Sequence, residues 1–214
     1  MDEFDKIFII SWVYNSEKRK QLANYLTKEF GITNFEFIYG IDPNFSNIND
    51  IQLYDKWLMY EPYKWRKELK EANNLNGYYK HHISALLANL SAWQISLAEG
   101  YNKILVFEDD VKFIEDKEKI IETFKNHPKD ADIVHYGYIK LLDHLDGYNE
   151  KYDETFSKTN KQIDGLQCYG IYNQETLKKF INHQNSIFSV VDQFMQDIPN
   201  INRYYVNEKI CYDR

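Results

Sequence analysis

The sequence predicts an α/β fold: a doubly wound, mixed and mostly parallel sheet flanked by helices. Three observations lead to this prediction. Short apolar runs that suit buried strands alternate along the chain with longer stretches of helical periodicity. The first run, a helix and a second run form a strand–helix–strand unit, whose strands lie parallel through a right-handed crossover. The 214 residues contain no linker rich in Gly, Pro or Ser, which predicts one domain over residues 1–214.

The strand–helix–strand unit opens the chain. Lys6–Val13 is a continuous apolar run, typical of a buried parallel strand, and Phe35–Ile41 alternates into a second strand. Apolar residues between them follow helical spacing from Ser16 onward. Asn15 or Ser16 is the expected N-cap of this helix, and Gly31 its C-terminal stop.

The periodicity of apolar residues weakens after the second predicted strand and becomes clear again from His82 onward. Asn-rich turns from about residue 44 to 77 predict a variable insert in the domain. His82–Gly100 is the clearest helix, because its apolar residues occupy one broad face and Gly100 ends it. This helix leads into the apolar run Ile104–Phe107, which is predicted to be a central strand.

The C-terminal half continues the alternation of strands and helices. Its long polar loop, Asp143–Gln162, is either a mobile lid or a plain flexible loop. The elements expected around it are a helix at Glu115–Asn126, strands at Asp132–Gly137 and Leu166–Tyr172, a helix at Gln174–Asn182 capped by Asn173, a short helix from Val190, and a closing strand at Arg203–Ile210.

Three carboxylates, Glu108, Asp109 and Asp110, follow the central strand directly. In an open α/β sheet the carboxyl ends of the strands bind ligands. Adjacent carboxylates repel one another unless a cation lies among them, and a hard divalent cation takes oxygen ligands. The alternative is that these acids solvate the strand end and cap the next helix. A phosphorelay receiver domain would need a second apolar strand ending in Asp about fifty residues later, but Tyr152–Asp164 is polar, which excludes it.

Composition narrows the classes of function. The formal net charge of -7 argues against a nucleic-acid partner, because such proteins present a basic surface to the phosphates. The N-terminus has acids where a signal peptide needs basic residues, and its apolar run is too short to cross a bilayer. We therefore expect a soluble, cytoplasmic protein, in which Cys168 and Cys211 are free thiols. The aromatic share of 16% is high. It is consistent with surfaces that stack on sugars, and also with the codon bias of an AT-rich genome.

Taken in order, the motifs resemble glycosyltransferase family 25, the lipopolysaccharide-type and collagen β-galactosyltransferases, which have a GT-A fold related to the Rossmann fold. The resemblance spans nearly the whole chain, and the order and spacing of its pieces make it specific. The pieces are Ser16-Glu17-Lys18-Arg19, Tyr39-Gly40-Ile41-Asp42, Leu90-Ser91-Ala92-Trp93, Val106-Phe107-Glu108-Asp109-Asp110-Val111, Cys168-Tyr169-Gly170-Ile171-Tyr172 leading to Leu177, and Val191-Asp192-Gln193-Phe194.

The resemblance implies a metal site. Glu108–Asp110 would be the DxD-type motif that holds Mn²⁺, or Mg²⁺, against the diphosphate of a nucleotide sugar. Asp110 would be the direct metal ligand, and Glu108 would contact the metal, or the ribose through water. Asp109 would belong to the nucleotide-sugar site or point back into the fold.

The resemblance also implies a nucleotide site and a general base. The nucleotide would lie over the end of the first strand, near Ser11, Trp12, Arg19 and Asp42, although Arg19 is equally consistent with an exposed helix residue. Family members of this kind invert the anomeric centre, which requires a base for the acceptor hydroxyl. Asp192 matches the late family motif and is the expected base; its alternative role is a helix N-cap.

The expected activity is metal-dependent, inverting transfer of a hexose, with galactose the first candidate, from a UDP-sugar to a glycan or glycosylated protein. No transmembrane segment is expected, which leaves room for peripheral contact with a membrane. The chain departs from the family at Trp12-Val13-Tyr14-Asn15, where Asn-Leu-Asp-Arg is usual, and at Ala88-Asn89, where Ser-His is usual. These departures motivate the alternative of a degenerate member that only binds nucleotide or glycan.

Overall fold

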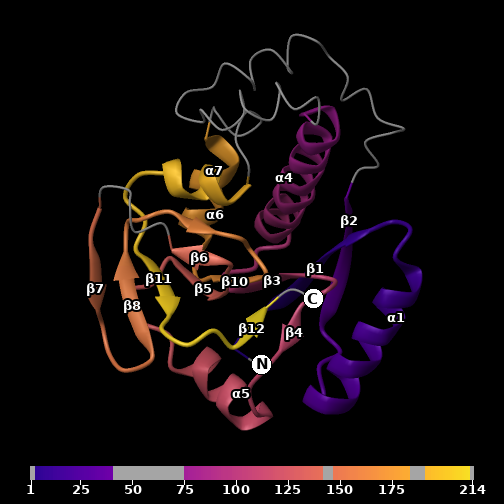
Figure 1. Ribbon diagram of the computed structural model, residues 1–214, viewed down its shortest axis with the longest axis horizontal. Helices are drawn as coiled ribbons and strands as arrows, with labels where there is room; N and C mark the ends of the chain where they lie inside the picture. The colour runs from indigo at the N-terminus through magenta and orange to yellow at the C-terminus, as the bar shows by residue number, and fades with distance from the viewer. Residues whose placement is uncertain (1–2, 41–74, 142–146, 184–190, 213–214) are drawn as a thin grey trace.

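A sheet of eight strands lies at the centre of the computed structural model, which describes residues 3–40, 75–141, 147–183 and 191–212 (Figure 1). The strand order is β2-β1-β3-β10-β5-β11-β8-β7. The strands are β1 (Lys6–Trp12), β2 (Phe35–Gly40), β3 (Ile104–Glu108), β5 (Ile133–Gly137), β7 (Asn149–Lys151), β8 (Phe156–Thr159), β10 (Cys168–Ile171) and β11 (Arg203–Val206).

The pairing of these strands brings their carboxyl ends to one edge. β1 pairs in parallel with β2 and with β3, and β5 pairs in parallel with β11. β10 is antiparallel to both β3 and β5, so β5 and β11 point the same way as β3. The ends of β1, β2, β3, β5 and β11 therefore share one edge, which we call the carboxyl edge. β10 begins at this edge, where Cys168 pairs with Phe107 and Gly137.

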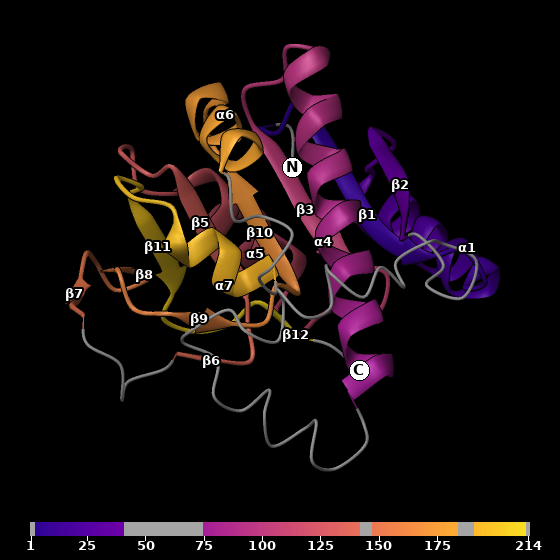
Figure 2. The same ribbon diagram turned by 90° about the horizontal axis from the view of Figure 1, so that it is seen from above.

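Helices cover both faces of the sheet, as Figures 1 and 2 show. One face carries α1 (Ser16–Tyr25), its π-helical continuation η1 (Leu26–Phe30) and α5 (Lys117–Lys125). The other carries α4 (Leu75–Ala98), α6 (Gln174–Asn182) and α7 (Val191–Asp197). We call these the α1 face and the α4 face. The predicted α/β class, with a mixed sheet flanked by helices, is confirmed.

Alternation along the strands gives each face its own hydrophobic core. In β1, Ile7 and Ile9 pack on the α1 face, whereas Phe8 packs on the α4 face. Trp93 of α4 lies at the centre of the second core, with its ring centroid 4.8 Å from that of Phe180 and 5.7 Å from that of Phe194. Each fully buried side chain of this size contributes about 1.5–3 kcal/mol, so the two cores fix the sheet and its edge.

Several predicted helix boundaries agree with the structure, and one does not. Gly31 ends η1 with a left-handed φ of 69°, as expected for a C-terminal stop. Asn173 caps α6, because its side chain accepts from the Thr176 N–H at 2.8 Å. α4 begins at Leu75 rather than at His82, so the end of the predicted insert is helical. Residues 41–74 of the insert region lie outside the described residues.

The predicted polar loop Asp143–Gln162 is wrong over most of its length. β7 and β8 form an antiparallel hairpin there, and β8 also pairs with β11. Phe156 is fully buried, so β8 adds to the core although most of its neighbours are polar. Residues 142–146 lie outside the described residues. The interpretation as a lid fails because strand pairing, a long-range interaction, holds this segment in the sheet.

The chain ends in two short strands rather than one long one. The predicted closing strand Arg203–Ile210 ends at Val206, and β12 (Cys211–Tyr212) follows it. β12 pairs with β4 (Lys112–Phe113), directly after the acids of the central strand. A second small sheet joins β6 (Lys140–Leu141) to β9 (Ile163–Asp164). Within the described parts of the chain, no helix is long and apolar enough to cross a membrane.

Candidate functional site

The three acids Glu108, Asp109 and Asp110, which we call the acidic triplet, lie at the carboxyl edge and are half-buried. Two backbone hydrogen bonds hold them there. The Glu108 N–H donates to the Gln167 carbonyl at 3.2 Å, and the Asp109 N–H donates to the Ile10 carbonyl at 2.9 Å. The first bond ties the triplet to the start of β10 and the second to the end of β1. The expected position at a strand end is confirmed.

Glu108 continues the side of β3 that faces α4. Ile104 and Val106 pack in the α4-face core, and successive side chains alternate in a strand. Tyr169 of β10 lies on the same face, where its hydroxyl donates to Asn89 Oδ1 at 2.6 Å and accepts from Trp93 Nε1 at 2.9 Å. Burial raises the pKa of Tyr169, and the negative charge of Glu108 raises it further. Glu108 thus lies beside a buried network of hydrogen-bonded polar groups.

Asp109 points to the α1 face instead. Its Oδ2 accepts hydrogen bonds from Ser11 Oγ at 2.5 Å and from Asn15 Nδ2 at 3.0 Å. Ser11 is only 3% exposed. Asn15, one of the two predicted N-caps, occupies the N-cap position of α1, but its side chain makes no capping hydrogen bond. Asp109 therefore joins the end of β3 to the loop between β1 and α1.

Arg19 completes this connection. Its guanidinium donates to Ser11 Oγ at 3.3 Å, to the Trp12 carbonyl, and to the Val13 carbonyl at 3.0 Å. It also lies 4.9 Å from the ring centroid of Tyr39. Arg19 is therefore not an ordinary exposed helix residue, because it fixes the backbone of the loop between β1 and α1.

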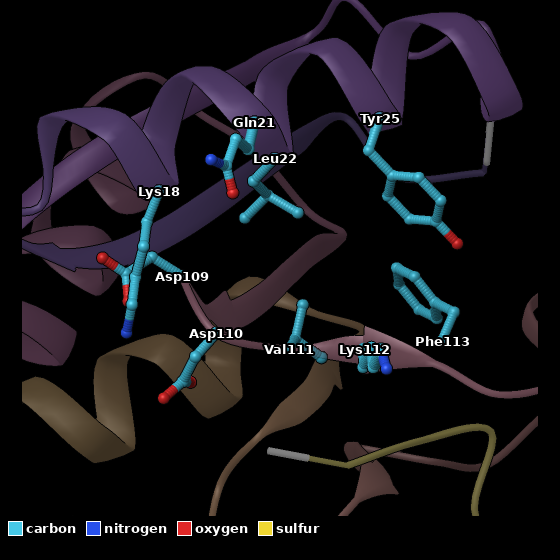
Figure 3. A pocket seen from close by; sticks show the side chains of 9 residues that line it. All are labelled: Lys18, Gln21, Leu22, Tyr25, Asp109, Asp110, Val111, Lys112 and Phe113. Carbon is cyan, nitrogen blue, oxygen red and sulfur yellow. The ribbon is translucent and has the colours of Figure 1, made fainter. Parts of the chain in front are cut away.

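A cavity of about 360 Å³ opens beside Asp109 and Asp110, between α1 and β4 (Figure 3). In Figure 3 the Lys18 side chain extends from α1 past Asp109, and Asp110 points away from α1. Tyr25 and Phe113 form the far end of the cavity, with their rings stacked at a centroid separation of 6.5 Å. Asp109 and Asp110 thus border open space on the α1 side of the sheet.

Asp192, near the start of α7, reaches the same edge from the α4 face. Its Oδ2 accepts from the Gly165 N–H at 3.0 Å. Gly165 has φ of +85°, a conformation that glycine adopts easily. Two residues later, Gln167 accepts from the Glu108 N–H. Asp192 and the acidic triplet therefore bind the same short segment, 165–167.

The structure brings most of the predicted site residues together. Ser11, Trp12 and Arg19 surround the end of β1, and the acidic triplet lies next to them. Asp42 is outside the described residues. The described residues contain no group of three or more His, Cys, Asp or Glu arranged to hold a metal ion.

Sequence reasoning missed three residues that shape the site. Asn15 is predicted as a possible cap and as part of the departure at residues 12–15, but not as the partner of an acid 94 positions away. Gly165 and Gln167 anchor Asp192 and Glu108 respectively. The Asp164-Gly165 pair is a turn signal that points to this segment, but no local pattern shows which side chains meet there.

The family of the chain follows from its sequence as a whole. The family model of glycosyltransferase family 25 (LPS biosynthesis protein) matches residues 4–210. The chain belongs to glycosyltransferase family 25. The resemblance inferred from the order of motifs is therefore confirmed, and glycosyl transfer is the activity of the family. A search of curated proteins found no match to this family 25 chain.

Three solved structures are similar to this glycosyltransferase at low sequence identity. A197 from STIV is 16% identical with a TM-score of 0.47, covering 94% of this chain and 80% of that one. A putative glucose-1-phosphate thymidylyltransferase from Bacillus anthracis, in complex with a sucrose, is 11% identical with a TM-score of 0.38, covering 92% and 66%. Mannose-1-phosphate geranyltransferase from Thermus thermophilus is 9% identical with a TM-score of 0.34, covering 98% and 74%.

Proposed function

We propose that this family 25 member transfers a hexose, with galactose the first candidate, from a UDP-sugar to a glycan or glycosylated protein, with inversion at the anomeric carbon. One structural observation supports the proposal in addition to family membership. The acidic triplet and Asp192 bind the same segment, 165–167, at the carboxyl edge of the sheet. A single displacement needs the leaving-group site and the base on the same side of the molecule, and this shared segment supports that arrangement.

The residues present fit a divalent cation. Glu108 and Asp110 are half-buried acids at a strand end, and Mn²⁺ or Mg²⁺ binds one or two carboxylates together with substrate phosphates and water. Asp110 would be the direct ligand, and Glu108 would bind the metal or reach the ribose through water. When bound, the cation supplies Lewis-acid stabilisation of the departing diphosphate. A set of three protein ligands is not needed for this kind of site.

Asp192 would act as the general base. Its carboxylate takes the proton of the acceptor hydroxyl as that oxygen bonds to the anomeric carbon, while the bond from the sugar to the diphosphate breaks and UDP leaves. The hydrogen bond from Gly165 orients this carboxylate at the edge. Asp192 also lies in the first turn of α7, where a negative charge interacts favourably with the helix dipole. The role of Asp192 as general base is compatible with its favourable position in the first turn of α7.

The nucleotide would lie over the loop that follows β1. Trp12 is half-buried at the end of β1, and Asp42 follows the end of β2, so both are proposed nucleotide contacts. Ser11, Arg19 and Asp109 belong to the same proposed site. Their hydrogen bonds described above join them to one another and to the loop, so their main contribution would be the shape of the loop.

Donor hydrolysis tests the proposal. The protein is incubated with a panel of UDP-sugars and Mn²⁺, and slow release of UDP is measured alongside metal-dependent UDP binding by calorimetry. Hydrolysis of UDP-galactose in preference to the other donors is the expected result. No turnover with any donor, together with no metal-dependent UDP binding, would refute the enzyme assignment.

A second candidate is a degenerate family member that binds nucleotide or glycan without transfer. Asn89, where the family usually has His, is buried and committed to Tyr169 and to the Ala85 carbonyl, so its amide is tied into the core. UDP binding that depends on metal, without hydrolysis or transfer of any donor, would favour this candidate.

A further inference from the structure

We propose that Asp109 is a positioning residue that locks the acidic triplet to the loop between β1 and α1, so that the two loops form one preformed unit. The inference rests on the proposed function, in which Asp110 binds the metal and the β1–α1 loop binds the nucleotide. It assigns Asp109 a role through its neighbours rather than through contact with the substrate.

The contacts of Asp109 all lead into the protein. Its N–H donates to the Ile10 carbonyl at 2.9 Å, and its Oδ2 accepts from Ser11 Oγ and Asn15 Nδ2. A shielded oxygen that accepts two hydrogen bonds holds its donors in place, because breaking the bonds leaves buried polar groups unpaired. Two such bonds on one oxygen are strong enough to fix a strand end.

Val111 packs into the α1-face core, but the two acids before it are packed less completely on this side. The cavity of about 360 Å³ borders Asp109, Asp110 and Val111 (Figure 3). A segment beside open space has few van der Waals partners there, so its polar bonds carry a larger share of its order. The position of Asp110 therefore depends on the neighbouring carboxylate of Asp109.

Arg19 extends the lock to the whole β1–α1 loop. It binds Ser11, which binds Asp109, and it also binds the carbonyls of Trp12 and Val13. The Asn15 N–H closes the loop by donating to the Trp12 carbonyl at 3.0 Å. A shift of Asp109 would therefore be transmitted to residues 12–15, and a shift of the loop would be transmitted to Asp110.

Hydrogen exchange without metal or nucleotide is the first test. Asp109→Ala is expected to speed exchange of the amides of residues 15, 109 and 111 at least tenfold, with the amides at the centres of β1 and β10 unchanged. Asn15→Ala, which removes one of the two side-chain bonds, should give a smaller increase in a variant that folds normally. Asp109→Asn should exchange like wild type, because its amide oxygen still accepts both bonds.

Binding of UDP in the presence of Mn²⁺ is the second readout. Asp109→Ala should weaken UDP binding about tenfold, whereas Asp109→Asn should stay within about threefold of wild type, since the lock and not the charge is what matters. Asp116→Ala is the matched control, because Asp116 is an exposed acid whose side chain makes no capping bond. It should change neither exchange nor binding.

The two readouts separate the outcomes. If Asp109→Ala loses UDP binding while its hydrogen exchange is unchanged, Asp109 is a direct ligand and the proposal is overturned. The proposal is also overturned if Asp109→Ala behaves like wild type in both hydrogen exchange and UDP binding. Weakened binding in Asp109→Asn equal to that in Asp109→Ala would also overturn it. If wild-type protein binds no UDP, the proposed function fails, and the exchange result alone decides whether Asp109 locks the loops.

Discussion

Asp192 accepts a hydrogen bond of 3.0 Å from the backbone N–H of Gly165. This bond joins α7 to the turn that precedes β10, and it sets the carboxylate at the carboxyl edge. The turn also holds the acidic triplet, because the Gln167 carbonyl accepts from the Glu108 N–H. Asp192 and Glu108, which are 84 positions apart in the sequence, are thereby both fixed against one three-residue segment.

Replacing Asp192 should separate chemistry from binding. Asp192→Asn keeps an oxygen that accepts from Gly165 but removes the basic carboxylate, so transfer should fall by about 10²–10⁴-fold. Metal-dependent UDP binding should stay within about twofold of wild type. Steady-state transfer and calorimetric UDP binding measure the two effects.

Asp192→Ala serves as the companion variant, because it also removes the bond to Gly165. It should lose transfer to the same extent and lose about 1 kcal/mol or more of stability as well. Transfer by Asp192→Asn at a wild-type rate would exclude Asp192 as the base and leave it a purely structural role.

The turn at Gly165 should tolerate no side chain. A Cβ added there would lie 2.7 Å from Ile139 Cγ1, 2.8 Å from Gln167 Nε2 and 2.9 Å from the Ile139 nitrogen. The positive φ adds about 1–2 kcal/mol and the overpacking about 1–3 kcal/mol. We therefore expect Gly165→Ala to lower the free energy of unfolding by about 2–5 kcal/mol, measured by urea denaturation.

Gly31→Ala is the control for this prediction. Gly31 also has a positive φ, of 69°, but a Cβ there would meet nothing within 4 Å. It should cost only the conformational part, about 1–2 kcal/mol. Equal losses in the two variants would contradict the tight contact at Gly165.

Local signals explain which parts of the fold the sequence predicts. α6 was predicted at its observed bounds, because an Asn cap precedes a helical pattern that is apolar on one face. The order β1–α1–β2 followed from the same kind of pattern. β10, which runs antiparallel between β3 and β5, was expected as a strand, but its place and direction depend on contacts far apart in the chain. Hairpin β7–β8 was missed because its residues are mostly polar.

The candidate site shows the same limit. The acids at the end of β3 were found from composition and position alone. The family resemblance allows Asp109 to point back into the fold, but the face to which it points depends on where Ser11 and Asn15 lie, nearly a hundred positions earlier. A carboxylate that binds a metal and one that binds the protein are identical in the sequence and differ only in their neighbours.

Asp110 is the acid whose loss should remove the metal. Asp110→Ala should abolish metal-dependent UDP binding, because a hard cation loses its direct carboxylate ligand. Thermal stability should change little, since Asp110 lies in a half-exposed turn beside the cavity. UDP binding with and without Mn²⁺ is measured by calorimetry, with melting temperature as the fold control. Normal UDP binding by Asp110→Ala would show that the metal ligand lies elsewhere.

Acid sensitivity of the fold should depend on His135. This side chain is 2% exposed in β5, and neither ring nitrogen has a hydrogen-bond partner. Burial, aided by the charge of Arg203, lowers its pKa to about 3. The imidazole is therefore neutral in the folded protein but binds a proton in the unfolded chain below pH of about 6.5. Its contribution to stability is complete above that pH and is lost progressively as the pH falls toward 3.

The effect is measurable by urea denaturation at several pH values. One such group changes the free energy of unfolding by about 1.4 kcal/mol per pH unit, or about 2 kcal/mol between pH 6.5 and 5. His135→Leu, which keeps an apolar group of similar size in the core, should flatten the profile by that amount in this interval. His127, also with a pKa lowered by burial, remains in the variant and contributes the residual slope. An unchanged slope in His135→Leu would mean that other groups cause the acid sensitivity.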